Sequence, residues 1–292
     1  MYEDMPNRHV QDLMMKLLYK NQPAGWNIAG EKKNILKMKR SDFVNYKKMH
    51  YLPEATVLVI SGQVEEKNVL KEVNRVFGHI PRGKKVGKIK TKDIQSRSEA
   101  LIKWKTTDQT HFVLGMRSYD FFNKKIPALS VLSGILGGGM SSRLFQKLRE
   151  EMGVGYYVRA YNDAFTDHGF LQISAGVDNK RIYEVLKAVI KECNILKNEL
   201  VGKEELEKVK EYLIGNMKLS LESSDDIANF YGGQELLKKE LKNIEEKARE
   251  IRHVDSKEIQ ALARDIFQDK KLNLAIVGPF KEKKSFLKIL KF

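Results

Sequence analysis

The sequence predicts an α+β fold: two homologous domains of antiparallel-rich sheet packed by helices, with the first domain incomplete. Three observations predict it. Short runs of apolar and β-branched residues alternate with amphipathic stretches of helical period. A unit of helix, strand, glycine and helix occurs twice in the same order. The length of 292 residues also exceeds the usual size of one domain.

The two copies of this unit have nearly the same dimensions. In the first, Ser41 starts a helix, the run 55–61 (ATVLVIS) reads as a buried strand, and a glycine follows the strand. In the second, Ser256 starts the helix and the apolar strand is 272–277. The spacing from serine to glycine is 21 residues in the first copy and 22 in the second. We interpret the repeat as an internal duplication in which the first domain lacks its beginning.

The other elements follow from periodicity, capping residues and turn residues. Further helices are expected at 7–19, 64–77, 126–136, 179–197, 203–221, 234–252 and from 281 onward. Further strands are expected at 100–104 and 111–116, and as an antiparallel pair at 157–161 and 169–177. The segments 21–30, 81–98 and 223–233 are expected to be loops or turns. Because 81–98 is rich in Lys and Gly it is the predicted linker, which gives domains at 1–95 and 96–292.

Composition excludes several classes of protein. No run of about 18 uncharged apolar residues occurs, so no membrane span is expected, and the acidic, polar start of the chain predicts a cytoplasmic location. The single cysteine, Cys193, excludes an intrachain disulfide and is interpreted as a helix-face residue. The net charge of +15 raises the question of nucleic-acid binding, but the lysine clusters carry no recognition motif. We assign them to solvated faces or to attraction of acidic partners.

The run 136–157, LGGGMSSRLFQKLREEMGVGYY, holds the densest local signals in the chain. The glycines Gly137–Gly139 allow either a flexible substrate-facing loop or close packing of a helix on a strand, and we favour packing. Ser141 or Ser142 can then cap a short helix with apolar residues on one face. That helix should stop near Gly153.

A strand should follow Gly155, because aromatic and β-branched residues come next. This arrangement places Arg149 and Tyr156 at the two sides of one helix–turn–strand corner. From spacing alone, two interpretations stay open. The pair can be a functional site, or Arg149 can pair with Glu150 or Glu151 at the surface while Tyr156 packs as a strand residue.

Four segments together resemble a known family. They are MYEDMP at 1–6, YLPEATVLVISG at 51–62, the run at 136–157, and MKLSLES at 217–223. In this order they resemble the pitrilysin/insulinase family of zinc metallopeptidases, including its mitochondrial processing peptidase branch. The resemblance covers essentially the whole chain and implies two homologous α+β domains in each half of a clamshell. Two such halves enclose a peptide chamber in that family.

The resemblance also implies roles for two residues. In the family, an Arg and a Tyr seven residues apart in the second domain reach the substrate at the zinc site, and the match falls on Arg149 and Tyr156. A guanidinium can fork onto a substrate carbonyl, and a phenol can donate to the oxyanion that develops during attack. These are the candidate catalytic residues, for substrate orientation and oxyanion stabilisation.

The family's zinc motif, HxxEH, is not found in this sequence. The nearest imitation is His50 with Glu54, but Pro53 stands between them, so a lone surface pair is the preferred interpretation. The histidines are His9, His50, His79, His111, His168 and His253, and no two stand four apart. We therefore expect no metal ligand in this chain, while the complete family enzyme is expected to hold zinc.

The sequence thus predicts a truncated zinc metalloendopeptidase that is inactive alone. It would act on peptide substrates as a homo- or hetero-oligomer with a zinc-bearing half. The alternative is a non-catalytic partner or structural subunit of a zinc-bearing sibling chain. Neither a nucleic acid nor a membrane is an expected partner.

Overall fold

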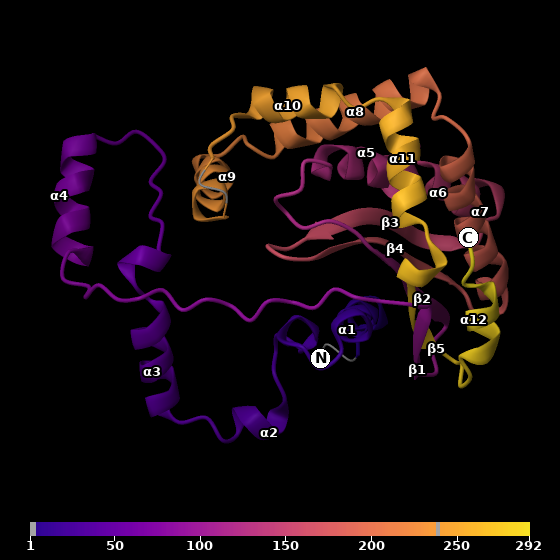
Figure 1. Cartoon of the computed structure of the whole chain (residues 1–292), viewed down its shortest axis with the longest axis horizontal. Coiled ribbons are helices and arrows are strands. Elements are labelled where there is room, and N and C mark those ends of the chain that lie inside the picture. The colour runs from indigo at the N-terminus through magenta and orange to yellow at the C-terminus, as the bar shows by residue number, and fades with distance from the viewer. Residues whose placement is uncertain (1–3, 238–239) are drawn as a thin grey trace. The chain divides into compact units, whose positions relative to one another are not determined.

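The computed structural model describes residues 4–237 and 240–292, and it confirms the predicted α+β fold class (Figure 1). Contacts divide the chain into two units. Unit 1 comprises Met1–Ile28, Lys90–Leu213 and Arg249–Phe292, and unit 2 comprises Ala29–Ile89 and Ile214–Ala248. Residues 81–98, the predicted linker, contain neither helix nor strand. The domain boundary at residue 95 stays a prediction, and the contacts group residues 1–28 with the sheet-bearing unit.

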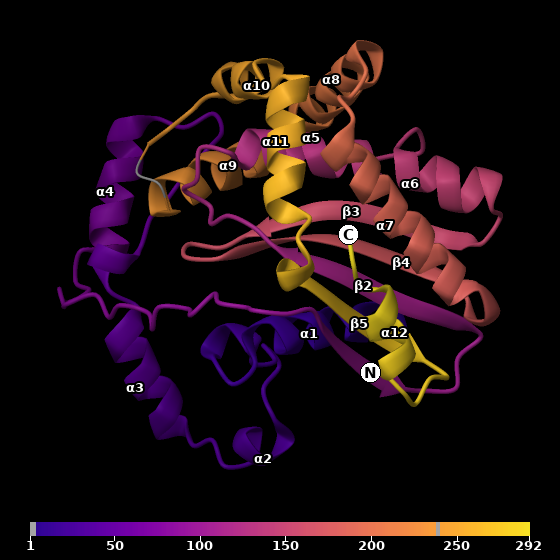
Figure 2. The same cartoon turned by 45° about the vertical axis from the view of Figure 1, so that its right-hand side comes forward.

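Unit 1 is built on a sheet whose strands are ordered β1-β5-β2-β4-β3 (Figure 2). The β1–β5 pair is parallel, and the pairs β5–β2, β2–β4 and β4–β3 are antiparallel. Every strand predicted from residue 100 onward is present, including the antiparallel pair around the polar turn. The strands are β1 (Glu99–Trp104), β2 (Gln109–Arg117), β3 (Gly155–Ala164), β4 (Gly169–Asp178) and β5 (Leu272–Gly278).

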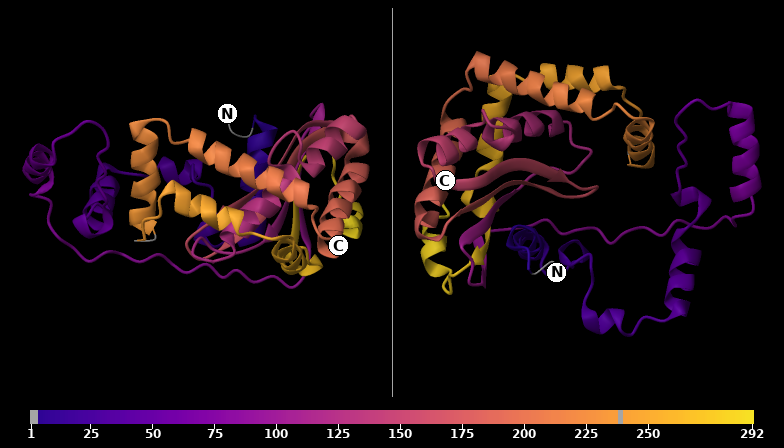
Figure 3. Two further views of the ribbon diagram at one scale, coloured as in Figure 1. Left: turned by 90° about the horizontal axis from the view of Figure 1, so that it is seen from above. Right: turned by 180° about the vertical axis from the view of Figure 1, so that it is seen from behind.

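Helices cover both faces of this sheet. Side chains alternate between the two faces along each strand, so each strand contributes apolar residues to both. On one face, Phe112 and Leu114 of β2 belong to a core shared with α5 (Ile126–Gly137), α7 (Ile182–Asn198) and α11 (Ser256–Ile266). On the opposite face, Val113 of β2 packs in a second core with Val10 and Met14 of α1 (Pro6–Tyr19). Figure 3 shows α1 and α5 on opposite sides of the strands. Each fully buried apolar side chain contributes about 1.5–3 kcal/mol.

A buried arginine fastens α1 and the linker to this sheet. The guanidinium of Arg117 in β2 donates to Asp93, to Gln95 Oε1 at 2.8 Å and to the carbonyl of Leu18. Its Cζ also lies 5.5 Å from the ring centroid of Tyr19. Because Arg117 is only 8% exposed, these partners satisfy a charge that would otherwise be costly to bury.

The remaining helices are α2 (Lys32–Ile35), which was not predicted, and others that agree with the sequence in type, with two corrections. The others are α3 (Arg40–His50), α4 (Glu66–Phe77), α6 (Arg143–Phe145), α8 (Lys203–Leu219), α9 (Ser224–Leu237), α10 (Ile244–Arg252) and α12 (Lys284–Ile289). Short 3-10 turns lie at Pro23–Gly25, Pro53–Ala55, Asn179–Arg181 and Asp269–Lys271.

The first correction concerns 223–233, which was predicted to be a turn and is the start of α9. Ser223 Oγ accepts from the amide of Asp226 at 3.1 Å and donates to its carboxylate at 2.6 Å. This exchange caps the helix, and Asp225 adds a second acid to its first turn. The polar composition that suggested a turn is therefore a helix N-terminus.

The second correction concerns 234–252, which was predicted as one helix. Helix α9 ends at Leu237 and α10 begins at Ile244, while residues 238–239 of the predicted helix lie outside the described part. A capping exchange starts α10: Asn243 Oδ1 accepts from the amide of Glu246 at 2.9 Å, and Glu246 Oε2 accepts from the amide of Asn243 at 2.7 Å. Such a box begins a new helix.

In unit 2, the predicted buried strand 55–61 is wrong. The described residues supply no neighbouring strand for this run, and a strand exists only through hydrogen bonds to a neighbour. Leu58 and Ile60 are 50% and 46% exposed, respectively. The helices on either side, α3 and α4, form as predicted, so the strand is the one member of the first repeat that differs.

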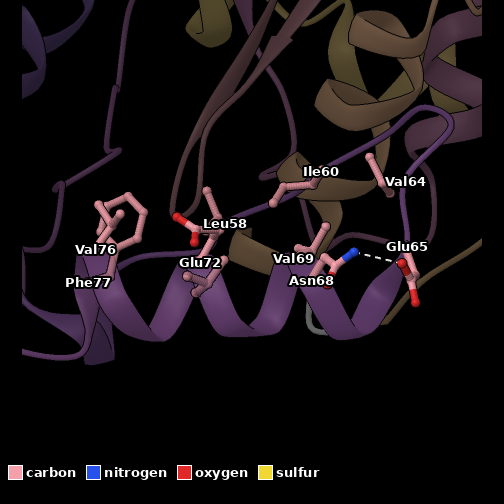
Figure 4. Close-up of a pocket in the computed structure, with 10 residues that line it drawn as sticks. Leu58, Ile60, Val64, Glu65, Asn68, Val69, Glu72, Val76 and Phe77 are labelled. Atoms are coloured by element: carbon pink, nitrogen blue, oxygen red, sulfur yellow. Dashed lines mark hydrogen bonds between the residues drawn. The ribbon is translucent and has the colours of Figure 1, made fainter.

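Unit 2 carries an apolar hollow of about 440 Å³ between this run and α4. Figure 4 shows Leu58 and Ile60 on the side of α4 that carries Val69 and Val76. Exposed apolar surfaces of this kind mark interaction sites or association.

We expect the full chain to self-associate through this hollow, as measured by light scattering. The double variant Leu58→Asp with Ile60→Asp should reduce association, because charges replace the apolar wall of the hollow. Ile94→Asp is the matched control, since Ile94 is 84% exposed but lies outside the hollow. A monodisperse monomer with a cooperative melt would contradict this prediction.

Candidate active site

The corner predicted at 136–157 begins where α5 ends against the sheet. A Cβ on Gly137 would lie 2.4 Å from the backbone nitrogen of Ala160 in β3. A Cβ on Gly139 would lie 3.2 Å from the ring of Tyr212 in α8. The glycines therefore allow close packing of helix on strand, which is the interpretation favoured from the sequence.

Two polar contacts fix the short helix α6 that follows. Ser142 precedes α6, and its hydroxyl donates back to the carbonyl of Gly139 at 2.6 Å rather than capping the helix. Arg143 donates from Nε and Nη2 to the two carboxylate oxygens of Glu205 in α8, each at 2.7 Å. These hydrogen bonds raise the pKa of Arg143 and make the fork a charge-assisted, bidentate contact.

The helix continues as a π-helical turn, Gln146–Glu151, and Arg149 lies in it. The amide of Met152 donates to the carbonyl five residues earlier, that of Lys147, at 3.1 Å. The Arg149 side chain is exposed, and its guanidinium Cζ lies 5.3 Å from the ring centroid of Phe145. A cation over an aromatic face is attracted to it, so Phe145 limits the directions that Arg149 can take.

The surface ion pair considered from the sequence is not formed. Glu151 instead accepts from Lys147 Nζ at 2.5 Å, one helical turn away. Within residues 4–237 and 240–292, Arg149 makes no ion pair with Glu150 or Glu151. Its guanidinium is thus available to an outside acceptor.

The turn after the helix ends at the predicted glycine. Gly153 has φ of +64°, a left-handed conformation that suits glycine. The amide of Val154 donates to the carbonyl of Leu148 at 2.9 Å, and Arg181 Nη1 donates to that of Met152 at 2.9 Å. Both bonds satisfy carbonyls that the helix end would leave unpaired.

Strand β3 starts with a bulge, and Tyr156 is the bulged residue. Gly155 pairs with Val177 of β4, but Tyr157 pairs with Gly176, so Tyr156 is an extra residue on β3. Bulges redirect a side chain out of the regular alternation. Tyr156 is 59% exposed, which argues against the alternative that it packs as a strand residue.

The structure thus places Arg149 and Tyr156 at the two sides of one corner. Both side chains are exposed, and in the part of the chain that is described no hydrogen bond joins them. Their roles toward a substrate stay predictions. The backbone around them is held by the Gly137 contact, the Arg143–Glu205 fork and the π-helical turn.

Sequence reasoning missed a polar pair beside this corner. His111 of β2 and Tyr157 of β3 approach to 3.2 Å between Nδ1 and Oη. They are 46 residues apart in the chain, so no local spacing points to the pair. The strand register would have revealed it, because both residues are opposite Gly176.

The described residues do not fit a zinc ion. Residues 4–237 and 240–292 contain no group of three or more His, Cys, Asp or Glu side chains that could hold a metal. At the nearest imitation of the zinc motif, His50 stacks on Tyr46 at 4.3 Å between centroids, and Glu54 Oε2 accepts from the amide of Gly83 at 3.2 Å. No chemical step through a metal is therefore derived from this chain's own residues.

The expectations for Cys193 and for membrane-spanning helices come from composition. Cys193 is buried on α7, and burial raises the pKa of its thiol, as fits a packed helix-face residue. Among the residues that are described, no helix has both the length and the apolar character needed to cross a bilayer.

Comparison with known proteins identifies the family of this chain. The family described as Peptidase M16 inactive domain matches residues 37–213. An uncharacterized zinc protease of Bacillus subtilis, YmxG, is 31% identical over 280 residues, which are 96% of this chain and 67% of that protein. The chain therefore belongs to the Peptidase M16 inactive domain family, which confirms the resemblance to the pitrilysin/insulinase peptidases.

Another relative matches this chain over a similar share of its length. A Rickettsia bellii uncharacterized zinc protease is 30% identical over 284 residues, covering 95% of this chain and 66% of that protein. The chain thus spans about two thirds of the length of the curated relatives it matches. The mitochondrial processing peptidase branch and the truncation stay predictions.

Solved structures share the fold. A peptidase M16 inactive domain from Pseudomonas fluorescens superposes with a TM-score of 0.86 at 21% identity, covering 97% of this chain and 68% of that one. A chain of complex III2 from Candida albicans also gives 0.86, at 13% identity, with coverages of 100% and 72%. At these identities the likeness concerns the fold alone.

Proposed function

We propose that this chain supplies the substrate-orienting side of a zinc metalloendopeptidase site, with Arg149 and Tyr156 as the groups that touch the substrate. One observation carries the proposal: both side chains are exposed at a corner whose backbone is fixed by the π-helical turn and the β3 bulge. Membership of the M16 inactive domain family supports it.

The chemistry of the two side chains suits peptide hydrolysis. The Arg149 guanidinium forks onto a peptide carbonyl oxygen and fixes the scissile bond in place. The Tyr156 hydroxyl donates a hydrogen bond to the same oxygen as it gains negative charge in the tetrahedral transition state. Because the oxygen gains its negative charge only in the transition state, this hydrogen bond stabilises the transition state more than the ground state.

Activation of the attacking water belongs to a second, zinc-bearing half, because the described residues hold no metal group. Relatives named zinc proteases support zinc as the metal of the complete enzyme. The chain would therefore act in an oligomer, with the zinc-bearing half facing the corner. Its substrates would be peptides, with a preference for acidic ones from the net charge of +15.

We expect the pure chain to show no chelator-sensitive cleavage of a fluorogenic peptide library. Adding a sibling half that carries HxxEH should produce cleavage, which a chelator abolishes and added zinc restores. The control is the same sibling half without this chain. Robust chelator-sensitive cleavage by the pure chain would contradict the proposal that a second, zinc-bearing half activates the water.

A second candidate function is that of a non-catalytic structural subunit. It is favoured by the fold shared with a chain of complex III2, and by the description of the matching family as inactive. If the chain is a structural subunit, removing it should disassemble the complex, while Tyr156→Phe should leave activity unchanged. The arrangement of genes also distinguishes the two candidate functions. A reading frame that contains HxxEH and is continuous with this one favours the peptidase. A separate neighbouring gene that contains HxxEH favours the non-catalytic subunit.

A cytoplasmic location belongs to the same proposal. Fractionation of cells that express the gene at its natural level would check it.

A further inference from the structure

We propose that His111 and Tyr157 form a bridge across Gly176 that holds the β3 bulge in register and thereby positions Tyr156. The effect on catalysis rests on the function proposed above, whereas the bridge itself does not. Tyr157 and His111 are positioning residues, since they act on the substrate only through the neighbouring Tyr156.

The bridge follows from the strand register. His111 of β2 and Tyr157 of β3 are both paired with Gly176 of β4, so the three residues form one row across three strands. Side chains of β2 and β3 are normally separated by those of β4, but glycine leaves the space open. The imidazole and phenol rings meet there, stacked at 5.8 Å between centroids and 25° between planes, with Oη and Nδ1 3.2 Å apart.

The surroundings keep both partners neutral. Burial lowers the pKa of His111 below its ordinary value, so the imidazole is uncharged at pH 7. Burial also raises the pKa of Tyr157 to about 12, so the phenol keeps its proton. A neutral imidazole has one nitrogen that donates and one that accepts, and in either tautomer one hydrogen bond to the phenol is possible.

Strand β3 is held further along by Val158 and Ala160 in the core, and the bridge adds a contact at its start. It is an edge strand, it starts with Gly155, and it lies opposite Gly176. Gly176 offers no side chain for the start of β3 to pair with, and a slip by one residue would turn every side chain there to the other face. An aromatic ring lying across a glycine on the next strand compensates for the missing side chain. Tyr157 does this immediately after the bulged Tyr156.

Three variants break the bridge in different ways. Tyr157→Phe removes the hydroxyl and keeps the ring. Gly176→Ala adds a Cβ that would lie 2.6 Å from Tyr157 Cε1, so the ring must leave its present position. His111→Leu removes the hydrogen-bonding partner, and His111→Gln restores a polar group. Tyr161→Phe is the matched control, since Tyr161 lies on the same side of β3 four residues further on.

The first measurement is hydrogen exchange of residues 153–158 in the full chain. Exchange there should become about tenfold faster in Tyr157→Phe, Gly176→Ala and His111→Leu. It should return toward the wild-type rate in His111→Gln and stay unchanged in Tyr161→Phe. If exchange of this segment in both Tyr157→Phe and Gly176→Ala equals that of the wild type, the bridge does not hold the bulge and the proposal is wrong.

The second measurement is the kinetics of the assembled peptidase. Tyr157→Phe should lower kcat about tenfold with KM changed less than twofold, because a misplaced Tyr156 loses contact with the transition state. A purely structural loss would lower the active fraction and leave kcat per active site unchanged. If exchange responds as expected but Tyr156→Phe itself leaves kcat unchanged, the bridge stands and the proposed function fails. If Tyr156→Phe lowers kcat while Tyr157→Phe does not, the positioning role is overturned.

Discussion

We expect Tyr156→Phe to lower kcat of the assembled peptidase about 100-fold, within the range of about 10²–10³ for loss of one oxyanion donor. We expect Arg149→Ala to lower kcat/KM by a similar or larger factor. In the proposed site the phenol donates to the oxygen mainly as charge develops, so its loss should act on kcat. The guanidinium also binds the ground-state carbonyl, so its loss raises KM as well. Steady-state kinetics on a fluorogenic peptide, with active sites counted by inhibitor titration, measures both.

The controls for this result lie on the same strand. Arg159→Ala and Tyr161→Phe change an exposed Arg and a half-exposed Tyr of β3 away from the corner, and both variants should retain kcat within twofold. Thermal unfolding should show that all four proteins are equally folded. Equal kcat in Tyr156→Phe and Tyr161→Phe would remove Tyr156 from the site.

Gly137→Ala destabilises the sheet-bearing unit by about 3 kcal/mol, the upper range for overpacking. The new Cβ would lie 2.4 Å from the nitrogen and 2.9 Å from the Cβ of Ala160, so α5 and β3 must move apart. The nearest atoms belong to the backbone and Cβ of β3, so no flexible side chain can move aside to make room. Guanidinium unfolding followed by circular dichroism measures the loss as a lower midpoint.

The matched control is Gly215→Ala in α8. It makes the same change inside a helix, but nothing lies within 4 Å of the new Cβ. It should be neutral or stabilise the chain by about 0.5–1 kcal/mol, because alanine favours a helix over glycine. A Gly137→Ala midpoint equal to that of the wild type would show that the contact with Ala160 relaxes freely.

The corner could be predicted because its signals are local. Gly153 ends the helix through its left-handed conformation, and the residues after Gly155 favour a strand, so both boundaries follow from neighbouring residues. The seven-residue spacing of Arg149 and Tyr156 then fixes their places at the corner. The π-helical turn was not predicted, because it differs from an α-helix only by one residue in the spacing of a local hydrogen bond, and the bulge was not predicted, because it depends on the register against β4.

The failed predictions have two physical causes. The run 55–61 has every local property of a strand, yet a strand needs a hydrogen-bonded neighbour, and composition does not report one. At 223–233 the polar residues were weighed as a turn, although Ser223 followed three residues later by Asp226 is a capping pattern. The His111–Tyr157 bridge depends on the register of three strands, which no single segment encodes.

The chain leaves unit 1 at Ile28 and returns to it at Lys90. The two points are close together, because the amide of Lys92 donates to Gln22 Oε1 at 2.6 Å and Gln22 Nε2 donates to the carbonyl of Lys92 at 3.1 Å. Residues 29–89 therefore form a closed loop with its ends tied together beside α1. The entropy lost on closing a flexible loop grows only logarithmically with length, by about 0.6 kcal/mol for each doubling. We therefore expect the stability of the sheet in unit 1 to depend little on the length of residues 29–89, whose helices belong to unit 2.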